Sequence, residues 1–571
     1  FSQSLLINEV VSSNSSVFYD EDGDTPDWVE IYNSNNTAIN LKGYGLSDDL
    51  SDKLKWKFPE TVIQPTEYLL VLASDKDKNN IVNSWDGEIT IGDEWKYWVG
   101  INEPPSDWNA INFNSTNWSE GPSGFGYGDG DDNTVLNQTI SVYVRRSFTV
   151  ENVEEISVIL FHLDYDDGYV AYINGKEFSR RNLGPENSNT SYNQTATGLH
   201  EADIYQGGFP EEIILDPNLL PLQSGENTIA IEVHNFSNSS SDLTCIPFLT
   251  IGYKSTYANL REPDKRIYLP ETYLHTNFKI KSTGEYLVLS DSNGVIVDSV
   301  FSGSIPTDRS KGRVLGGSSW KLFDTPTPGK ANPSIGYNGF LSPPIFSIKT
   351  GFYSTAQKIT LAHFNSDAKI YYTLDGSEPN ENSYIYNTEL TINANTPIRA
   401  RSMQSGWMPS SIETQTYLFD TAPDIPVIAL NVDPKDLFDS SSGIYSRGPS
   451  AADAFPHFGA NFWQDWEKPA QFDIIDINGN NYSASAGIKI FGGWSRGNPQ
   501  KSFSLFARKQ YGTSQFDYQI FPKSSVDSYE SFIIRNSGND WEQTMLRDGY
   551  VNSIINVTGV DYQQYRPAIG Y

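Results

Sequence analysis

The stretch Asp166-Asp-Gly-Tyr-Val-Ala-Tyr-Ile-Asn-Gly175 combines a strand signal with a turn signal. Its apolar run of tyrosine, valine and isoleucine favours a β-strand, because aromatic and β-branched side chains pack well on a pleated surface. The run ends in Asn174-Gly175, and such a pair between apolar runs is typical of a two-residue hairpin turn. The stretch therefore predicts a β-hairpin that turns at Asn174.

Segments of the same kind recur along nearly the whole chain of 571 residues. Short alternating runs are separated by Gly, Asn, Asp and Pro, as expected for strands and turns. One longer helix is predicted over 541–557, where Leu546, Tyr550 and Ile554 recur every four residues after the capping-type pair Asn539-Asp540. A chain of this length exceeds a single hydrophobic core, so we expect several mainly β domains.

The composition limits the classes of partner. Lys and Arg number 40 against 71 Asp and Glu, a net charge of −31, which argues against nucleic acid or an anionic membrane as a partner. The same charge favours cation binding. The aromatic content of 13% suits β-sandwiches and carbohydrate-contacting surfaces.

Two features of the sequence lead us to expect an exported protein. No run reaches the roughly 18 apolar residues that a membrane span needs, so no transmembrane segment is predicted. The chain enters a strand within its first residues, which we interpret as a mature amino terminus left after removal of a signal peptide. The single cysteine, Cys245, lies in an apolar strand-like run and is interpreted as a buried small hydrophobe.

Two separated sets of motifs resemble one family. Leu6-Ile-Asn-Glu-Val10 and Asp27-Trp-Val-Glu-Ile-Tyr-Asn33 come first, and His275-Thr-Asn-Phe-Lys-Ile280 and Thr327-Pro-Gly-Lys-Ala-Asn332 follow much later. Together they resemble the lamin-tail domain, an immunoglobulin-like sandwich. The resemblance implies one such domain, split over 1–83 and 267–335 by an insertion, which an exposed loop tolerates when the host strands stay paired.

The insertion, 84–266, resembles the galactose-binding-like jelly rolls of glycosidases and secreted proteins. The resemblance rests on Gly124-Phe-Gly-Tyr-Gly-Asp-Gly130, the stretch 166–175 and Gly225-Glu-Asn-Thr-Ile-Ala-Ile-Glu-Val-His-Asn235. Its exposed aromatic residues would be candidates for sugar contacts, and core packing is the favoured role for most of them: Trp95, Trp98, Trp108, Trp118 and Tyr127.

The segment 340–419 resembles the chitobiase carboxy-terminal β-sandwich through Ala368-Lys-Ile-Tyr-Tyr-Thr-Leu-Asp-Gly-Ser-Glu-Pro379. A proline-bounded linker follows. Its tripeptide Asp420-Thr-Ala422 fits the pattern on which Bacteroidota attach O-glycans to exported proteins, which makes Thr421 a candidate glycosylation site.

The segment 427–571 resembles the amino-terminal half of the CotH-type atypical protein kinases. The resemblance rests on Ala486-Gly-Ile-Lys-Ile-Phe-Gly-Gly-Trp-Ser-Arg496, Gln500-Lys-Ser-Phe-Ser-Leu505 and Ile534-Arg-Asn-Ser-Gly-Asn-Asp540. It implies ATP and magnesium as cofactors and phosphoryl transfer to a secreted protein. The family's catalytic acids are expected beyond Tyr571, so no catalytic residue is assigned.

Lys501 is the strongest nucleotide candidate, because a strand-borne lysine behind a Gly-rich hairpin is how kinases hold phosphates. Arg496 could add a forked phosphate contact. In the family, groups at the other candidate positions line or brace the nucleotide cleft, and the alternative roles are helix capping, an ion pair or an ordinary surface strand. These positions are Arg535, Asn536, Asn539, Asp540, Arg547 and Asp548.

Calcium is a second candidate cofactor. Asp20, Asp22 and Asp24 alternate around a glycine, a spacing that can wrap oxygen ligands about calcium, although the loop does not follow the EF-hand pattern. Asp166 and Asp167 are further candidates, and the stretch 128–133 is similar in composition. The alternative for each is a solvated acidic loop.

The predicted fold is mainly β: several β-sandwich and jelly-roll domains in tandem, one inserted in another, followed by an incomplete α+β kinase-like domain. The expected protein is secreted or on the outer cell surface of a Gram-negative bacterium, suspected to be cargo of the type IX secretion machinery. Its function is expected to be that of an atypical kinase. The alternative is a non-catalytic adhesion or carbohydrate-binding protein with a protein or glycan ligand.

Overall fold

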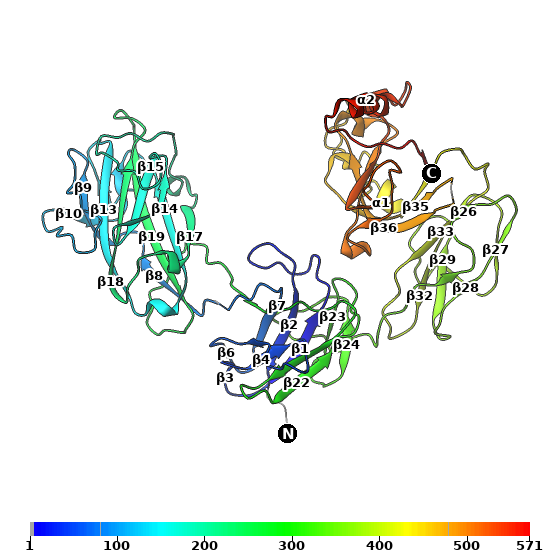
Figure 1. Cartoon of the computed structure of the whole chain (residues 1–571), viewed down its shortest axis with the longest axis horizontal. Coiled ribbons are helices and arrows are strands. Elements are labelled where there is room, and N and C mark those ends of the chain that lie inside the picture. Colours follow the sequence, from blue (N-terminus) through cyan, green and yellow to red (C-terminus); the bar gives the residue numbers. More distant parts are fainter. Residues whose placement is uncertain (1–4, 80, 478) are drawn as a thin grey trace.

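The chain, analysed as a computed structural model that describes residues 5–79, 81–477 and 479–571, is built almost wholly of β-sheets. Strands account for 36% of the residues and helices for 7%, which confirms the predicted mainly β class. Figure 1 shows the strands gathered into separate β bodies along the chain, with strands β8 to β19 forming a body of their own. The domain limits given above stay predictions.

The first body is a sandwich whose strands come from two distant parts of the chain. One sheet has the order β20-β7-β2-β1-β23-β24, and the other has the order β22-β21-β4-β5. A shared core of Leu, Ile and Val side chains joins the two sheets. The strands are β1 (Leu5–Val11), β2 (Asp27–Asn33), β3 (Ile39–Asn40), β4 (Gly45–Ser47), β5 (Trp56–Lys57), β6 (Val62–Ile63), β7 (Tyr68–Ala73), β20 (Leu274–His275), β21 (Tyr286–Ser290), β22 (Ile296–Phe301), β23 (Ser310–Arg313) and β24 (Trp320–Phe323).

Two buried glutamates connect the late strands to the early ones. Glu9 on β1 accepts hydrogen bonds from the backbone N–H and the hydroxyl of Thr327, and Ser310 also donates to it. Glu30 on β2 accepts from Asn8 at 2.7 Å and from the N–H of Gly329 at 2.5 Å. Both glutamates are 0% exposed. They supply the buried acceptors that fix the segment around 327–329 against β1 and β2.

The inserted body consists of two six-stranded sheets around one apolar core. Their orders are β10-β9-β13-β18-β15-β16 and β12-β11-β19-β14-β17, and β8 also pairs with β19. The elements are β8 (Ser84–Ile89), β9 (Glu94–Val99), β10 (Ser119–Pro122), β11 (Phe125–Tyr127), β12 (Thr134–Val135), β13 (Ser141–Val150), η1 (Val153–Glu155), β14 (Ile156–Tyr165), β15 (Gly168–Ile173), β16 (Lys176–Arg181), η2 (Ile204–Gln206), β17 (Glu211–Leu215), η3 (Pro217–Leu219), β18 (Gly225–His234) and β19 (Leu243–Tyr253).

The hairpin predicted at Asn174 is present. β15 and β16 pair antiparallel with Ile173 opposite Lys176, and both Asn174 and Gly175 have positive φ angles, 49° and 84°. These angles are those that a two-residue hairpin turn requires.

The aromatic candidates of this body mostly lie in its core. Trp95, Trp108 and Trp118 are 1%, 7% and 6% exposed, and Trp108 stacks on Trp118. Trp98 and Tyr127 are partly buried. Core packing is therefore the role of at least the three buried tryptophans. Cys245 is fully buried on β19, as expected, and burial raises the pKa of its thiol.

The chain enters and leaves the inserted body through two neighbouring segments. β20 pairs parallel with β7, and beyond this pair the N–H of Asp77 donates to the carbonyl of Thr276. Further out, the N–H of Asn83 donates to the carbonyl of Tyr253 at 2.8 Å. These contacts define what we call the neck, residues 74–79, 81–83 and 253–276.

The last two bodies follow in sequence. The first has the five-stranded order β26-β33-β32-β29-β30, and the second the six-stranded order β40-β37-β36-β35-β34-β41. The elements of the first are β25 (Ile345–Phe346), β26 (Gly351–Phe352), β27 (Gln357–Ile359), β28 (Leu361–Ala362), β29 (Lys369–Thr373), β30 (Tyr384–Ile385), β31 (Leu390–Ile392), β32 (Thr396–Met403) and β33 (Glu413–Leu418). Those of the second are β34 (Val427–Val432), α1 (Pro434–Phe438), η4 (Asn461–Trp463), β35 (Lys468–Ile475), β36 (Tyr482–Phe491), η5 (Trp494–Gly497), β37 (Ser502–Phe506), η6 (Lys509–Tyr511), β38 (Phe516–Asp517), β39 (Ser528–Tyr529), β40 (Ser531–Ile534), η7 (Gly538–Asp540), α2 (Arg547–Ile555), η8 (Asn556–Thr558) and β41 (Ile569–Gly570).

A buried carboxylate joins these two bodies. Asp473 on β35 accepts hydrogen bonds from Thr416 of β33 at 2.9 Å and from Ser483 of β36 at 2.5 Å. Asn431 of β34 also donates to the Thr416 hydroxyl. Burial raises the pKa of Asp473 to about 6.

The helix predicted over 541–557 is shorter than expected. α2 spans Arg547–Ile555, and Leu546, Tyr550 and Ile554 are all about half exposed or more. The late start has a local cause, because the Asp540 carboxylate accepts from the N–H groups of Leu546 and Arg547. Of the helices within the described ranges, none combines the length and the apolar character that a membrane crossing requires.

We expect the sandwich to lose stability as the pH rises through the neutral range. Burial raises the pKa of Glu30 to about 8 from an ordinary value of 4.5, so the folded state holds a proton that the unfolded state has released between these values. This contribution is fully present below about pH 4.5, and it declines as the pH rises towards 8, with a slope approaching ~1.4 kcal/mol per pH unit.

The substitution Glu30→Gln tests this expectation. A glutamine side chain cannot lose a proton, so the fall in the free energy of unfolding between about pH 5 and 8 should be smaller by the contribution of one titrating group. The variant also loses one accepted hydrogen bond, so we expect it to be less stable than the wild type at the lower pH. Thermal unfolding across that range is the measurement, with the exposed Glu381→Gln as the control. Parallel pH profiles for wild type and Glu30→Gln would contradict the assignment.

Candidate functional site

The Gly-rich segment of the last body forms the turn between two paired strands. β36 and β37 pair antiparallel from Gly487 opposite Phe506 to Phe491 opposite Ser502. Between them, the chain turns at Gly492, whose φ of +114° favours glycine, and then forms the short helix η5. The expected hairpin is therefore present.

An open hollow of about 340 Å³ lies beside this turn. It is lined by Phe491, Gly492, Gly493, Ser495, Arg496, Ser502 and Arg535. Two guanidinium groups, two hydroxyl groups and a pair of glycines thus face one space. The glycines leave the backbone open to a ligand because they carry no side chain.

Arg496 is held firmly at the edge of the hollow. Its Nε donates to the carbonyl of Gly492 at 2.6 Å, and its Nη1 donates to the carbonyl of Phe462 at 3.3 Å. The guanidinium also lies over the ring of Trp463, 5.7 Å from its centroid. Its Nη2 donates to none of the described residues, so that donor remains available.

Arg535 reaches the hollow from the end of β40. Its Nη2 lies 2.8 Å from Asp548 Oδ2, on helix α2, and both side chains are more than two-fifths exposed. The next residue, Asn536, anchors this strand end, because its side-chain oxygen accepts from Ser502 at 2.9 Å and from the N–H of Gly538. The pair Arg535–Asp548 is therefore exposed but placed by a buried polar contact.

Lys501 is not one of the residues that line the hollow. Its Nζ donates to the carbonyls of Arg496 and Asn498, at 2.5 and 3.0 Å, and lies 3.8 Å from the centre of the Phe462 ring. The residue is 7% exposed, and burial lowers the pKa of its amine to about 8, although the two carbonyls and the ring favour the charged form. Lys501 thus fixes the turn that carries Arg496.

Asp540 and Asn539 occupy different environments. Asp540 is buried and accepts from the Thr544 hydroxyl at 2.6 Å, and this contact, followed by the backbone N–H of Arg547, lowers its pKa to about 2. Asn539 is exposed. Of the predicted nucleotide residues, Arg496 and Arg535 line the hollow, and Asp548 pairs with Arg535. Lys501 and Asp540 instead bind backbone groups of neighbouring segments.

Ser495 and Ser502 were not among the predicted residues, whereas Asn536 was. Ser495 and Ser502 line the hollow, and Asn536 orients Ser502. A signal for them exists in the sequence, since each lies within a motif already singled out. Serine is too common in turns for that signal to distinguish Ser495 and Ser502.

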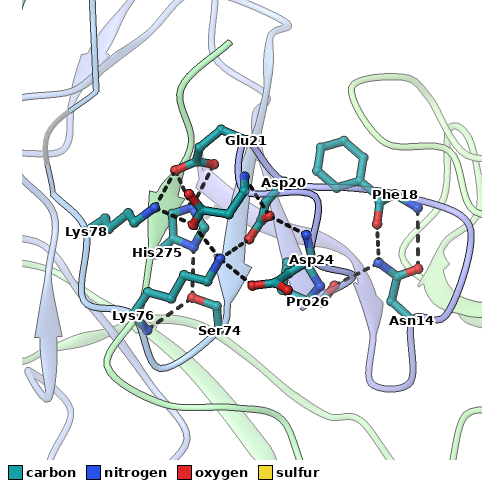
Figure 2. Close-up of polar contacts among 11 residues, drawn as sticks. Asn14, Phe18, Asp20, Glu21, Asp24, Pro26, Ser74, Lys76, Lys78 and His275 are labelled. Carbon is teal, nitrogen blue, oxygen red and sulfur yellow. Dashed lines mark hydrogen bonds and ion pairs between the residues drawn. The ribbon is translucent and has the colours of Figure 1, made fainter. Parts of the chain in front are cut away.

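The loop between β1 and β2 places its acidic residues around a lysine (Figure 2). Lys76 Nζ lies 2.6 Å from Asp20, 2.6 Å from Asp22 and 2.8 Å from Asp24. The contact with Lys76, followed by that with Lys78, lowers the pKa of Asp22 to about 2. The ammonium group therefore occupies the centre of the three carboxylates proposed as calcium ligands.

The same cluster lies at the neck. Glu21 accepts from His275 Nε2 at 3.0 Å, and Ser74 contacts His275 Nδ1 at 2.8 Å (Figure 2). Lys76 and Lys78 directly follow β7, whereas His275 belongs to β20. The acidic loop thus holds the entering and leaving segments of the inserted body together.

Asp166 and Asp167 lie between β14 and β15 and are 3% and 2% exposed. The carboxylate of Asp167 accepts from the N–H groups of His200 at 2.8 Å and Phe236 at 2.7 Å. Burial and the neighbouring Asp167 raise the pKa of Asp166. Asp167 therefore fastens two loops, and calcium binding by this pair stays a prediction.

Thr421 is exposed in the segment between β33 and β34. Its neighbour Asp420 accepts a hydrogen bond from Asn395. An enzyme could therefore reach the hydroxyl of Thr421, and its glycosylation stays a prediction.

Replacing Lys76 should loosen the acidic loop. In Lys76→Gln, three carboxylates lose the ammonium group between them, and we expect their repulsion to expose residues 18–26. Limited proteolysis measures this as faster cleavage within that loop. Lys42→Gln, which removes an exposed lysine paired with Glu60, is the matched control. Equal cleavage of both variants would show that the lysine is dispensable.

Three segments of the chain match protein families. Residues 2–148 match the lamin tail domain, residues 348–416 match the chitobiase/beta-hexosaminidase C-terminal domain, and residues 488–571 match the CotH kinase protein family. The last segment contains the hollow. The first extends into β8 to β13, whose strands pair within the inserted body. No curated protein matches the chain.

Solved structures resemble the chain weakly. A beta-glucuronidase from an uncultured Clostridium species has 10% identity and a TM-score of 0.20, with 59% of this chain and 45% of that chain covered. Bacteroides uniformis beta-glucuronidase 2, bound to an aziridine, has 9% identity and a TM-score of 0.21, with 71% and 33% covered. A calcium-binding mutant of the same enzyme has 9% identity and a TM-score of 0.21, with 74% and 33% covered. The chain spans less than half the length of these enzymes.

The family matches confirm three of the resemblances drawn from sequence motifs. The chain is a multidomain protein with lamin-tail, chitobiase-type and CotH-type segments.

Proposed function

We propose that residues 427–571 form the nucleotide-facing part of a CotH-like atypical kinase, and that the hollow beside Gly492 receives the phosphate groups of ATP. The observation that carries this proposal is the convergence of Arg496 and Arg535 on one open hollow behind a glycine hairpin. The match of residues 488–571 to the CotH kinase family supports it.

The chemistry of the lining suits phosphate. A guanidinium group offers a planar fork of donors that matches phosphate oxygens and keeps its charge at any physiological pH. Arg496 is already oriented by its carbonyl contacts, so little side-chain entropy would be lost on binding. The hydroxyl of Ser495 can add a neutral hydrogen bond, whereas that of Ser502 already donates to Asn536.

Lys501 acts in this proposal as a positioning residue. Its ammonium group holds the carbonyls of Arg496 and Asn498 and so sets the direction of the Arg496 side chain. Magnesium would accompany the nucleotide, and it prefers carboxylate and phosphate oxygens. Asp548 is an exposed carboxylate at this site, since it pairs with Arg535.

Calorimetric titration of the chain with ATP and magnesium tests the proposal. We expect Arg535→Ala and Arg496→Ala each to weaken binding by roughly 10- to 100-fold, the range for a lost hydrogen bond to a charged group. The control is Arg508→Ala, which removes an arginine paired with Glu467 at the opposite end of β37. Lys501→Met should weaken binding while leaving Arg535 in place.

The results separate the two functions considered for this chain. Loss of ATP binding in the hollow variants, with retention in Arg508→Ala, supports the kinase proposal. Absence of ATP binding in the wild-type chain would contradict it and leave the adhesion or glycan-binding function. Binding that survives both arginine substitutions would move the nucleotide site elsewhere.

We also propose that the protein acts outside the cytoplasm, as a secreted or outer-surface protein, with type IX secretion as the suspected route. The chitobiase-type and lamin-tail segments support this location. Exposure of Thr421 in a linker supports O-glycosylation there.

Mass spectrometry of natively produced protein tests both points. We expect the peptide that contains Thr421 to carry a glycan mass, and Thr421→Val to abolish it. Recovery of the protein only from the cytoplasmic fraction would contradict export, whereas an unmodified peptide in exported protein would contradict glycosylation alone.

A further inference from the structure

The last two bodies meet along one strand of each. We call them the third body, strands β25 to β33, and the fourth body, strands β34 to β41 (Figure 1). On β35, Gln471 donates to the carbonyl of Thr414 on β33 at 3.0 Å, and Asp473 accepts from the hydroxyl of Thr416 on β33 at 2.9 Å. Alternate side chains of a strand point to one face, so a single face of β35 contacts β33. We call this contact the joint.

An apolar cluster closes the joint on one side. Leu418 on β33 lies in it with Val427 on β34 and Ile475 on β35, and Phe352 on β26 packs against it. Leu418, Val427 and Ile475 are 1%, 2% and 6% exposed. Water is therefore excluded from this part of the joint, and polar groups beside the cluster need partners within the protein.

Asp473 lies inside the joint and accepts one hydrogen bond from each body. Its Oδ2 accepts from Thr416 of the third body at 2.9 Å, and its Oδ1 accepts from Ser483 of the fourth body at 2.5 Å. Asn431 donates to the Thr416 hydroxyl at 2.9 Å and so orients it towards the carboxylate. Asp473 is 0% exposed. A buried chain of hydrogen bonds thus crosses the joint through this carboxylate.

The charge of Asp473 is not balanced by a cation. In the part of the chain that the structure describes, no lysine, arginine or histidine forms an ion pair with it. From β33, Glu413 adds a second negative charge, which is itself paired with Lys349 at 3.7 Å. Tyr417 on the same strand is kept neutral, because burial raises the pKa of its hydroxyl. The hydrogen-bond partners from β34 and β36 are uncharged.

The protonation of Asp473 is linked to the joining of the two bodies. Burial raises the pKa of Asp473 to about 6 from an ordinary value of 3.8. Separation of the bodies would expose the carboxylate and return its pKa towards the ordinary value. The joined form therefore gains stability that is fully present below about pH 3.8 and is lost as the pH rises through 6. The contact with Ser483 can persist on protonation, because a hydroxyl turns to accept a proton as readily as it donates one.

We propose that Asp473 makes the joint a pH-sensitive connection, which holds the third and fourth bodies together more firmly in weakly acidic solution than at neutral pH. β36 carries Ser483 near its start and ends at Phe491, beside the glycine turn of the hollow. The joint thus sets how firmly the third body is attached to the sheet that bears the hollow. The proposal does not depend on whether the hollow binds a nucleotide.

Calorimetric unfolding of the full chain at about pH 5 and about pH 7 tests the proposal. Between these values the equilibrium should shift roughly 10-fold towards separated bodies, and we expect the melting temperature of the last two bodies to fall by about 3–5 °C. In Asp473→Asn, which keeps the size of the side chain but cannot ionise, this fall should disappear. Asp527→Asn, at an exposed position of the fourth body, is the matched control and should retain it.

The chosen range separates Asp473 from the other titrating groups. Lys501 in the fourth body has a pKa of about 8 and largely keeps its charge up to pH 7. Proteolysis during heating, with mass mapping of the fragments, identifies the transition of the last two bodies. The other carboxyl groups whose pKa is raised to about 6 or above lie in the first two bodies and act on other transitions: Asp27, Glu30, Asp131, Asp132 and Asp166.

Thr416→Val gives a second test from the other side of the joint. The substitution removes a hydrogen bond that favours the ionised form of Asp473, so the pKa of Asp473 should rise and the loss of stability should move to higher pH. The variant is also expected to be less stable than the wild type at every pH, because Asn431 loses its acceptor. Only the shift of the pH profile reports on the proposal.

Two results would overturn the proposal. One is a melting temperature of the last two bodies that is the same at both pH values in the wild type, and the other is an Asp473→Asn profile parallel to that of the wild type. If Asp473→Asn does not fold, Thr416→Val decides. A shift of its profile to higher pH supports the proposal, and a uniform loss of stability with an unchanged profile overturns it.

Discussion

The pairing of strands separated by some 300 residues of sequence is the constraint on which the amino-terminal sandwich depends. β1 lies between β2, a near neighbour in sequence, and β23, which follows the whole inserted body. Glu9 and Glu30 reinforce this pairing from inside the fold, because the late segment 327–329 satisfies their buried oxygens. An acceptor buried at this depth is costly when unpaired, so the two glutamates select one closure of the sandwich over alternatives.

The sequence predicted local structure well and long-range placement less well. Asn174-Gly175 predicted its hairpin correctly, because the turn depends on the φ angles of those two residues alone. The helix over 541–557 was predicted too long, because Asp540 binds the backbone of Leu546 and Arg547 and delays the first turn. That contact spans six residues and lies outside the periodicity from which the helix was predicted.

In the candidate sites, too, the sequence predicted local features better than the placement of residues that are distant in sequence. The glycine hairpin and Arg496 could be found from their motif, whereas the inward direction of Lys501 depends on Phe462, which is distant in sequence. The regular spacing of Asp20, Asp22 and Asp24 suggested a metal, yet Lys76 lies among them. Spacing of carboxylates therefore says little about cation binding until the position of the nearest lysine is known.

The neck decides how the molecule would respond to mechanical force. The segments that enter and leave the inserted body are hydrogen-bonded to each other, from Asp77 with Thr276 to Asn83 with Tyr253. Tension applied between the two ends of the chain would pass from β7 to β20 through these contacts, and the inserted body would hang outside the path of the load. Under such tension, the sandwich would carry the load while the inserted body keeps its shape.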